Sequence, residues 1–448
     1  MSAAPIVVPS GYPKETRTML KDRYDLDLCT ASQTARDAYV DGADRILCAL
    51  AHVEQTLAVA IEADPDFALA HVALARQHYL CARTKDARNS IETAAGLAGG
   101  LTEREQTHVE IFRLMMTGDP PAALELTREH MRSYPLDAFA LAPSCGVFGL
   151  IGFSGRVERE AEQLALLEPL AGHYGDDWWF LSAHAFALLE MGQWEQALEM
   201  MQRSMAQSPR NAHGAHTLTH ALYEGGQDER AANYLEDWLP DYDADGLLHC
   251  HAWWHLCLLK VMQGRLDEVW PIYDANCAPS VSTSPAINVL TDGCSLLWRA
   301  ELAGAPVQTG RWEMMRDYYT HTFPKPMVFV DAHGALPFAA LGDSQGVDIV
   351  IAQVEELGNR GRLPAGTLGC DLSKGFAAFA ASDWSTAINT LEPIMEQVVR
   401  VGGSRAQRDL VTNTLLAAYV KDGRMEDARA LAAAAHDRQP TRPVAGLN

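Results

Sequence analysis

The stretch that decides the fold runs from residue 211 to residue 274 and reads NAHGAHTLTHALYEGGQDERAANYLEDWLPDYDADGLLHCHAWWHLCLLKVMQGRLDEVWPIYD. Two segments of helical periodicity are each interrupted by a glycine, Gly226 in the first half and Gly264 in the second. A glycine between two amphipathic segments is typical of the turn in a helical hairpin. The stretch therefore predicts two helical hairpins in series.

The first helices of these hairpins are rich in histidine, with His213, His216, His220, His249, His251 and His255. His213 and His251 each lie thirteen residues before the turn glycine of their hairpin. His216 and His220 lie ten and six residues before Gly226. Residues three or four apart share one face of a helix, so these four side chains are predicted to face the same way. In stacked hairpins the first helices line the concave side, where such arrays bind their ligands.

The same spacing recurs along the chain, because a small residue seven positions before a turn and another five after it let two helices approach closely. The bracketing pairs are Ala75 and Ala87, Ala185 and Ala197, Thr219 and Ala231, Ala335 and Val347, and, with a bulkier first partner, Leu416 and Ala428. Gly192 and Gly226 are separated by the 34 residues of one tetratricopeptide period. The spacing predicts eight to ten hairpins, some of irregular length, and no β-sheet domain.

The predicted fold class is all-α, an irregular tetratricopeptide-like α-α superhelix. Residues 1–26 contain three prolines and little periodicity, so they are expected to form an extended lead-in that wraps the first helices. Residues 27–448 are expected to form a single superhelical domain. Capping boxes are predicted at Thr102 with Glu105 and at Ser404 with Gln407, because each pair has the spacing of a helix N-terminus.

Composition restricts the class of protein. A hydrophobic content of 48% with 21% charged residues excludes a disordered chain. The formal net charge of −22 disfavours a phosphate backbone or an anionic bilayer as partner, so neither nucleic acid nor membrane is expected. Nine cysteines without a Cys-x-x-Cys pair fit a reducing compartment, and the start of the sequence shows no secretory signal. We therefore expect a cytoplasmic protein, and a homodimer is compatible with the sequence.

Several segments, in order and with matching gaps, resemble the tetratricopeptide repeat protein 38 family. They are LCTAS (28–32), DPDFALAH (64–71), LTEREQTHV (101–109), HTLTH (216–220), HAWWHL (251–256), DGCSLLWRAELAG (292–304), DAH (331–333) and GGSRAQRD (402–409). The resemblance covers nearly the whole chain and implies an all-helical superhelix of irregular repeats, but no particular reaction. The sequence departs from the family's pattern at His249, an additional histidine, and at Ala252, where a polar residue is usual.

The first candidate catalytic group is His216, His220, His251 and His255. A histidine pair at i and i+4 can place two nitrogens on one metal ion, and two adjacent helices could complete four ligands. However, His255 lies nine residues before its turn, off the expected groove midline, and no glutamate follows either first histidine. Since no carboxylate stands at ligand spacing, the sequence predicts a metal-free protein without a cofactor.

The second candidate group uses acid–base chemistry without a metal and adds Asp292, Asp331 and His333. A carboxylate that orients an imidazole is the minimum apparatus for proton transfer near neutral pH. Asp331 and His333 are two residues apart and cannot face each other on a helix, so their partners must come from elsewhere. The structural alternative is that Asp331 caps a helix and His333 is a buried, hydrogen-bonded core residue.

The candidate ligand-binding residues are Arg405, Arg408, Trp253, His213 and Cys145. The two arginines at a helix N-terminus could hold a carboxylate or phosphate, or could form ion pairs with the acidic body. Trp253 is the aromatic residue most suited to contact a ligand, whereas Trp254 and Trp298 are expected in the core. Cys145 lies ten residues before Gly155 and is expected to face the groove.

Two functional hypotheses follow. The first is a binding protein whose concave groove, lined by histidine, tryptophan and arginine, takes a small anionic ligand or a peptide. The second is an enzyme on the same scaffold that uses the histidines on a small carboxylate-bearing substrate. Both predict that at least four of seven side chains lie within about 10 Å of one point. The seven are His216, His220, His251, His255, Asp292, His333 and Arg405.

Overall fold

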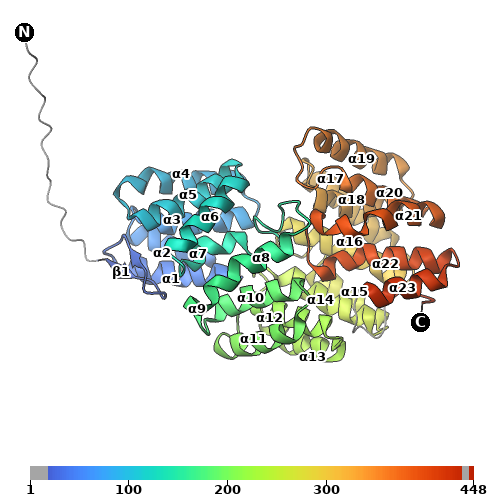
Figure 1. The fold of residues 1–448 in the computed structure, drawn as a ribbon, viewed down its shortest axis with the longest axis horizontal. Coiled ribbons are helices and arrows are strands. Elements are labelled where there is room, and N and C mark those ends of the chain that lie inside the picture. Colours follow the sequence, from blue (N-terminus) through green and yellow to red (C-terminus); the bar gives the residue numbers. More distant parts are fainter. Residues whose placement is uncertain (1–18, 436–442, 448) are drawn as a thin grey trace, which may run out of the picture.

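The computed structural model describes residues 19–435 and 443–447, and within these ranges the fold is helical almost throughout (Figure 1). The two strands that it contains, β1 (Leu20–Lys21) and β2 (Asp27–Leu28), form a short antiparallel pair. The predicted all-α class is confirmed. Among the described residues, no helix combines the length and the apolar content needed to cross a bilayer.

The helices divide into three consecutive groups. The first group is α1 (Gln33–Leu47), α2 (Val53–Ala63), α3 (Ala68–Leu80), α4 (Thr84–Leu97), η1 (Ala98–Gly100), α5 (Glu103–Thr117), α6 (Pro120–Ser133), α7 (Ala138–Leu141), η2 (Ala142–Ser144), α8 (Arg159–Leu167), η3 (Glu168–Leu170) and α9 (Ala171–Tyr174). The second is α10 (Trp178–Glu190), α11 (Trp194–Gln207), α12 (Ala212–Glu224), α13 (Asp228–Trp238), η4 (Leu239–Asp241), α14 (His249–Met262) and α15 (Leu266–Asn276). The third is α16 (Ala286–Leu302), α17 (Thr309–Thr322), α18 (Val328–Ala340), α19 (Ser344–Asn359), α20 (Leu368–Ala380), α21 (Trp384–Leu391), η5 (Glu392–Val401), α22 (Arg405–Lys421) and α23 (Met425–Ala435).

Most helices pair with the next one as a hairpin, and first helices of neighbouring hairpins also touch, as α1 with α3, α10 with α12, and α16 with α18. Gly192 and Gly226 have φ angles of 78° and 66° at two of the predicted turns, a conformation that glycine adopts without strain. The ten bracketing residues named above are all buried. The spacing rule therefore identified both the turns and the residues at the close contacts between helices.

The described part of the lead-in contacts α1, α5 and the residue before α10. Arg23 forms ion pairs with Asp44 and Asp177, and the backbone N–H of Cys29 donates to Oε1 of Glu105 at 2.9 Å. This last bond corrects the capping box predicted at Thr102. The Thr102 side chain does cap α5, but the buried Glu105 carboxylate accepts from Cys29 and from the Thr102 hydroxyl. The carboxylate therefore holds the lead-in. Residues 1–18 of the expected lead-in lie outside the described residues.

The N-terminal hairpin also contacts the middle of the array. The N–H of Ala212 donates to the Cys48 carbonyl at 3.0 Å, and the N–H of Leu247 donates to the Ala49 carbonyl at 3.2 Å. The Tyr242 hydroxyl donates to the same Ala49 carbonyl at 2.6 Å. The turn after α1 is thereby tied to the first turn of α12 and to the segment before α14.

The C-terminal hairpin contacts the middle of the array from the other side. In Figure 1, α22 lies beside α16, and the two helices are in contact. Tyr223 at the end of α12 donates to Oδ2 of Asp409 in α22 at 2.5 Å, although 186 residues separate them. Ser404 and Gln407 form the predicted capping box at the start of α22. The predicted capping box is therefore confirmed. Through α22, the last hairpin contacts α12 and α16 in the middle of the array.

A buried polar cluster stabilises the N-terminal repeats. Oδ2 of Asp137 accepts from Arg104 at 2.6 Å and lies 3.0 Å from Nδ1 of His108 and 3.2 Å from Nε2 of His130. Burial alone would raise the pKa of Asp137. The charges and hydrogen bonds of His108, His130 and Arg104 outweigh it and lower that pKa well below its ordinary 3.8. The carboxylate is thus the common partner of Arg104, His108 and His130.

The Asp137→Ala substitution is expected to lower the free energy of unfolding by about 3 kcal/mol, because it removes the nearer of the two counter-ions of the buried Arg104 guanidinium and leaves Glu105 at 3.8 Å. A folded-state pKa below the unfolded value stabilises above that unfolded value and ceases to do so as the pH falls. The gap between wild type and variant should therefore narrow as the pH falls below about 4. Urea unfolding at several pH values measures both effects.

The matched control is Asp317→Ala, which removes an exposed carboxylate paired with Arg316 and should change little. Equal effects of the two substitutions, or a gap that widens in acid, would contradict this assignment.

Candidate functional site

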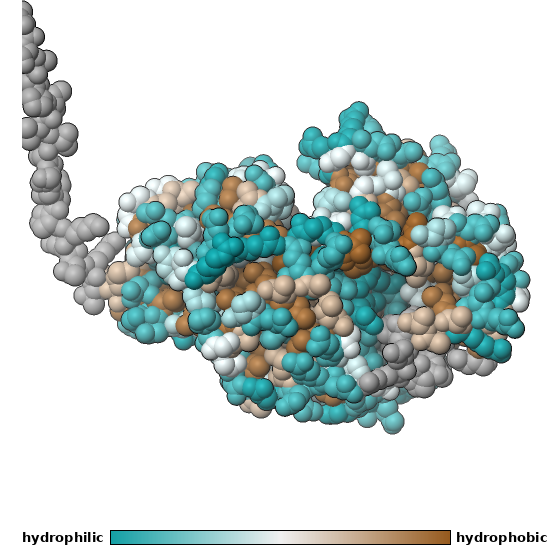
Figure 2. Space-filling view, in the orientation of Figure 1, coloured by the Kyte–Doolittle hydropathy of each residue, from teal (hydrophilic) through white to brown (hydrophobic). Residues whose placement is uncertain are grey.

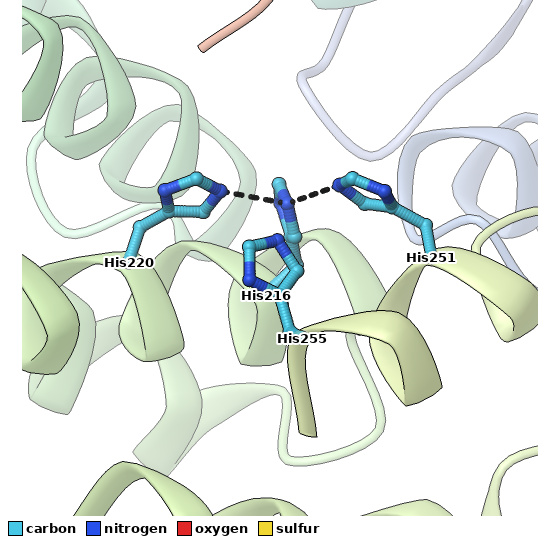
Figure 3. Close-up of side chains that lie close together, drawn as sticks. All are labelled: His216, His220, His251 and His255. Carbon is cyan, nitrogen blue, oxygen red and sulfur yellow. Dashed lines mark hydrogen bonds between the residues drawn. The ribbon is translucent and has the colours of Figure 1, made fainter. Parts of the chain in front are cut away.

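Four imidazoles converge at the centre of the array, His216 and His220 from α12 and His251 and His255 from α14. One ring nitrogen of each lies within 4.8 Å of the corresponding nitrogen of the others. Figure 3 shows the rings of His220 and His251 pointing toward His216 from opposite sides. His216 is partly exposed, whereas the other three are buried. His255, which the sequence placed off the midline of the groove, therefore lies in the cluster with the other three histidines.

Hydrogen-bond distances connect the cluster to a carboxylate. Nε2 of His216 lies 3.0 Å from Nε2 of His220 and 3.0 Å from Nε2 of His251. Nδ1 of His251 lies 2.8 Å from Oδ2 of Asp292 in α16, so this N–H donates to the carboxylate. Burial raises the pKa of Asp292, and His251 opposes that rise, followed by Gln407 and Asn288. The carboxylate fixes the ring of His251 with Nε2 toward the cluster.

Aromatic side chains wall the cluster on two sides. Phe186 of α10 stacks on His216 with 6.1 Å between ring centroids, and Trp254 stacks on His251 at 5.0 Å.

Burial, followed by the neighbouring imidazoles, lowers the pKa of His216 well below 6.5, and burial lowers the pKa of His220 to about 3. At neutral pH both rings are uncharged, and each has one nitrogen with a free electron pair.

Arg76 of α3 lies close to two of the predicted ligand-binding residues, His213 and Cys145. Burial and then the positive charge of Arg76 lower the pKa of His213 to about 4. Burial raises the pKa of Cys145 to about 12, against the opposing effect of Arg76. Cys145 is thus a protonated thiol at neutral pH, without the lowered pKa that a nucleophilic cysteine needs. Arg76, Cys145, His213 and His216 are each partly exposed yet desolvated, as expected for residues inside a concave surface.

The Arg76 guanidinium forms no ion pair with a carboxylate of the described residues. Its polar contact is the sulfur of Met115 at 3.9 Å, and its cation–π partner is the ring of Tyr79 at 5.9 Å. Burial lowers the pKa of Arg76 to about 10, which leaves it charged at neutral pH. In a chain of net charge −22, this is a positive group that no carboxylate of residues 19–435 or 443–447 pairs with.

Arg405 and Arg408 are arranged differently from the anion site that the sequence suggested. Arg405 pairs with Glu224 at 3.3 Å, and Arg408 pairs with Glu160 and, at 3.4 Å, with Glu190. The backbone N–H of Arg405 also donates to Glu190 at 3.2 Å. The guanidiniums are therefore balanced by carboxylates of the same chain, as in the alternative interpretation. Their contacts join the start of α22 to α8, α10 and α12.

Three further candidates lie outside the four-histidine cluster. Asp331 accepts from the Tyr319 hydroxyl at 2.8 Å and from the backbone N–H of Met327 at 2.7 Å, at the N-terminus of α18. Nδ1 of His333 bonds to the carbonyl of Phe329 at 2.7 Å, and the residue is buried. The contact of His333 matches its structural alternative. Asp331 does not stand at the predicted N-cap position, which Met327 occupies, but its carboxylate accepts from the Met327 N–H. Trp253 donates to Nε2 of His249 at 3.0 Å, while Trp254 and Trp298 lie in the core as expected.

The predicted convergence is confirmed for the four histidines together with Asp292, which contacts His251. Sequence reasoning missed Arg76, although it lies six residues before the turn at Ala82, the same offset as His220 before Gly226. Phe186 has this offset from Gly192 as well. Applying the offset rule to every hairpin, instead of to histidines alone, would have placed both on the concave side.

A family model described as the tetratricopeptide repeat matches residues 188–249, which include α11, α12 and α13. This part of the chain is therefore similar to tetratricopeptide repeats. Among solved structures, the chain is 11% identical to a chain of the human IFIT1 dimer with PPP-AAAA, covering 95% of this chain and 97% of that chain, with a TM-score of 0.39. Yeast Tom70 is 12% identical, with 92% and 84% covered and a TM-score of 0.34.

The ion pairs at the start of α22 generate a prediction about the pH dependence of stability. Burial raises the pKa of Glu190 from 4.5 to about 7, against the opposing charge of Arg408. A raised pKa means that the folded state binds the proton more tightly, so this group destabilises the fold as the pH rises from 4.5 to 7. The Glu190→Gln variant should lack this part of the pH dependence, at most about 3 kcal/mol, in urea unfolding at pH 5 and pH 7.5.

The control is Glu199→Gln, an exposed glutamate in the same hairpin, which should retain the wild-type pH dependence. A Glu190→Gln variant with the full wild-type slope would show that Glu190 is ionised throughout this range.

Proposed function

We propose that the concave interior binds a small anionic ligand between Arg76 and the histidine cluster. The observation that carries this proposal is the Arg76 guanidinium, which is desolvated, partly exposed and without a carboxylate partner among the described residues. A carboxylate or phosphate is the natural partner of such a guanidinium, because two parallel hydrogen bonds can form between them. His213 and His216 would contribute neutral imidazoles beside the anion.

The net charge of the protein favours a small ligand over an extended polyanion. The protein carries a net charge of −22, which disfavours long-range attraction of any anion, so recognition has to come from contacts inside the concavity. Figure 2 shows the molecular surface hollowed between the N-terminal hairpins and the hairpin of α18 and α19, with many polar residues around the hollow. A peptide with an acidic side chain or terminus is the second kind of ligand that this arrangement would accept.

An enzymatic role is the second candidate, and the contact between His251 and Asp292 favours it. At 2.8 Å, the carboxylate orients the imidazole so that Nε2 can accept a proton from a bound substrate. The substrate would carry a carboxylate or phosphate, held by Arg76. Asp331, His333, Arg405 and Arg408 have no part in this proposal, since the structure gives each of them internal partners.

We further propose that the chain belongs to the tetratricopeptide repeat protein 38 family. The motif GGSRAQRD at 402–409 supports this, because its residues make the contacts that close the array: Ser404 and Gln407 cap α22, and Arg405, Arg408 and Asp409 bond to α8, α10 and α12. The role of the motif in closure gives a physical reason for that sequence.

Anion binding is tested by thermal unfolding with inorganic phosphate and with small mono- and dicarboxylates, each compared with chloride at equal ionic strength. A ligand that binds only the folded state should raise the wild-type midpoint with the logarithm of its concentration above Kd, by roughly 2 °C or more at about a hundred times Kd. The Arg76→Gln variant should lose this rise, and Arg76→Lys should keep part of it because the charge remains but the planar fork does not.

The control is Arg113→Gln, which removes a partly exposed arginine paired with Glu110 on α5 and should respond as wild type does. A wild-type protein stabilised no more by these anions than by chloride, or an Arg76→Gln variant stabilised as much as wild type, would refute the anion site.

A further inference from the structure

We propose that His216, His220, His251 and His255 form a binding site for one divalent transition-metal ion, with Asp292 as the outer carboxylate that orients His251. The sequence suggested a metal-free protein because no carboxylate stands at ligand spacing near these histidines. The structure supplies the carboxylate from α16, 41 residues after His251 in the sequence. The site goes beyond the anion-binding function proposed above and does not depend on it.

The hydrogen-bonding capacity of the cluster is the first argument. A neutral imidazole has one N–H donor and one nitrogen with a free electron pair. The proton of His251 lies on Nδ1, toward Asp292, so its Nε2 can only accept. Nε2 of His216 lies 3.0 Å from Nε2 of His251 and 3.0 Å from Nε2 of His220. Because a ring nitrogen carries either one proton or one electron pair, it can form a hydrogen bond with only one of these two neighbours.

The fourth histidine strengthens this argument. Nε2 of His255 is buried and has no hydrogen-bond partner among the described residues. A buried nitrogen without a partner costs free energy, and protons alone leave the cluster with unmatched electron pairs. A single cation at the centre would accept an electron pair from each of the four rings.

The dimensions fit such an ion. Nitrogens bound to zinc lie 2.0–2.1 Å from the metal, which places the four corners of a tetrahedron about 3.3 Å apart. The two contacts to His216 are 3.0 Å, and no pair of ligand atoms is more than 4.8 Å apart. Small rotations of the side chains, which shift the ring nitrogens by about 1 Å or less, would place all four nitrogens at bonding distance from one ion. The stacked Phe186 and Trp254 limit the rotation of the rings.

The chemistry of the ligands selects the class of metal. Imidazole suits zinc, copper, nickel and iron, whereas magnesium and calcium require oxygen ligands. The hydrogen bond from His251 to Asp292 has the form that accompanies most metal-bound histidines, in which an outer carboxylate fixes the tautomer and makes the ring a better donor. We assign the site to a first-row divalent ion of the zinc type.

The test uses the full chain, purified with an affinity tag free of histidine, stripped with a chelator, dialysed against Zn²⁺ and freed of excess metal. Elemental analysis should find about one zinc ion per chain. Cobalt(II) added to the stripped protein should give the visible absorption bands of a nitrogen-bound ion and lose them when zinc is added. His216→Gln and His255→Gln should each lose stoichiometric zinc and the cobalt spectrum. Asp292→Asn, which preserves shape, should bind zinc about 10- to 100-fold more weakly.

Matched controls separate a specific site from the loss of any buried histidine or aspartate. His184→Gln and His333→Gln remove buried histidines outside the cluster, and Asp331→Asn removes the buried carboxylate of α18. All three should retain one zinc ion. Arg76→Gln should also retain it while losing the anion response, so that the metal site and the anion site can fail separately.

One measurement needs no variant and covers the case in which the histidine substitutions prevent folding. Bound zinc should protect His216, the partly exposed member of the cluster, from diethyl pyrocarbonate in the wild-type chain, as mapped by peptide mass spectrometry, and leave exposed histidines such as His52 reactive. Zinc that is removed by dialysis, a cobalt spectrum that persists in His216→Gln, or a His216 that reacts equally with and without zinc would overturn the assignment.

Discussion

The rest of the structure depends on the ion pairs at the start of α22. Arg405 and Arg408 meet Glu160, Glu190 and Glu224, which belong to helices more than 180 residues away in the sequence. Buried charges of one sign cannot persist without partners of the other sign, so these residues favour a single arrangement of the last hairpin over all others. An open superhelix would leave both arginines and the glutamates desolvated and unpaired, or would expose them and lose the interface between α22 and α16.

Closure also determines the chemistry of the centre. The N-terminus of α22 brings Gln407 to Asp292, and Asp292 fixes the ring of His251. His251 in turn faces His216. The histidine cluster is therefore the inner end of a chain of contacts that starts at the capping box of the last hairpin. This coupling explains how a segment of the sequence remote from the histidines can control their geometry without touching them.

The sequence predicted the direction of a side chain correctly where that direction depends on a single hairpin. Counting from the turn placed His216 and His220 on the concave side, and the small residues around Gly192 and Gly226 at the close helix contacts, because helical periodicity fixes both. It was less informative about partners, which depend on how neighbouring hairpins are rotated and shifted. Glu190 and Glu224 both lie two residues before a turn glycine, yet nothing in either hairpin indicates that Arg405 will reach them. Likewise, the carboxylate of Asp292 was expected near the histidines, but its contact with Nδ1 of His251 depends on the register between α14 and α16.

The charge distribution links the two sites. Other desolvated cations of this acidic protein have carboxylate partners, as Arg104 has in Asp137 and Arg405 has in Glu224, whereas Arg299 donates to the backbone carbonyls of Ala406 and Gln407. Around Arg76 and the four imidazoles the only carboxylate in direct contact among the described residues is Asp292, which the N–H of His251 already occupies. A divalent ion bound there would add two positive charges near Arg76 and would increase the affinity of the interior for an anion. Binding energies are reciprocal, so the anion would strengthen metal binding by the same factor. A carboxylate or phosphate compound that contacts both Arg76 and the metal ion would thus be held by an ion pair at one end and by metal coordination at the other. Closure of the array separates this interior from the acidic outer surface.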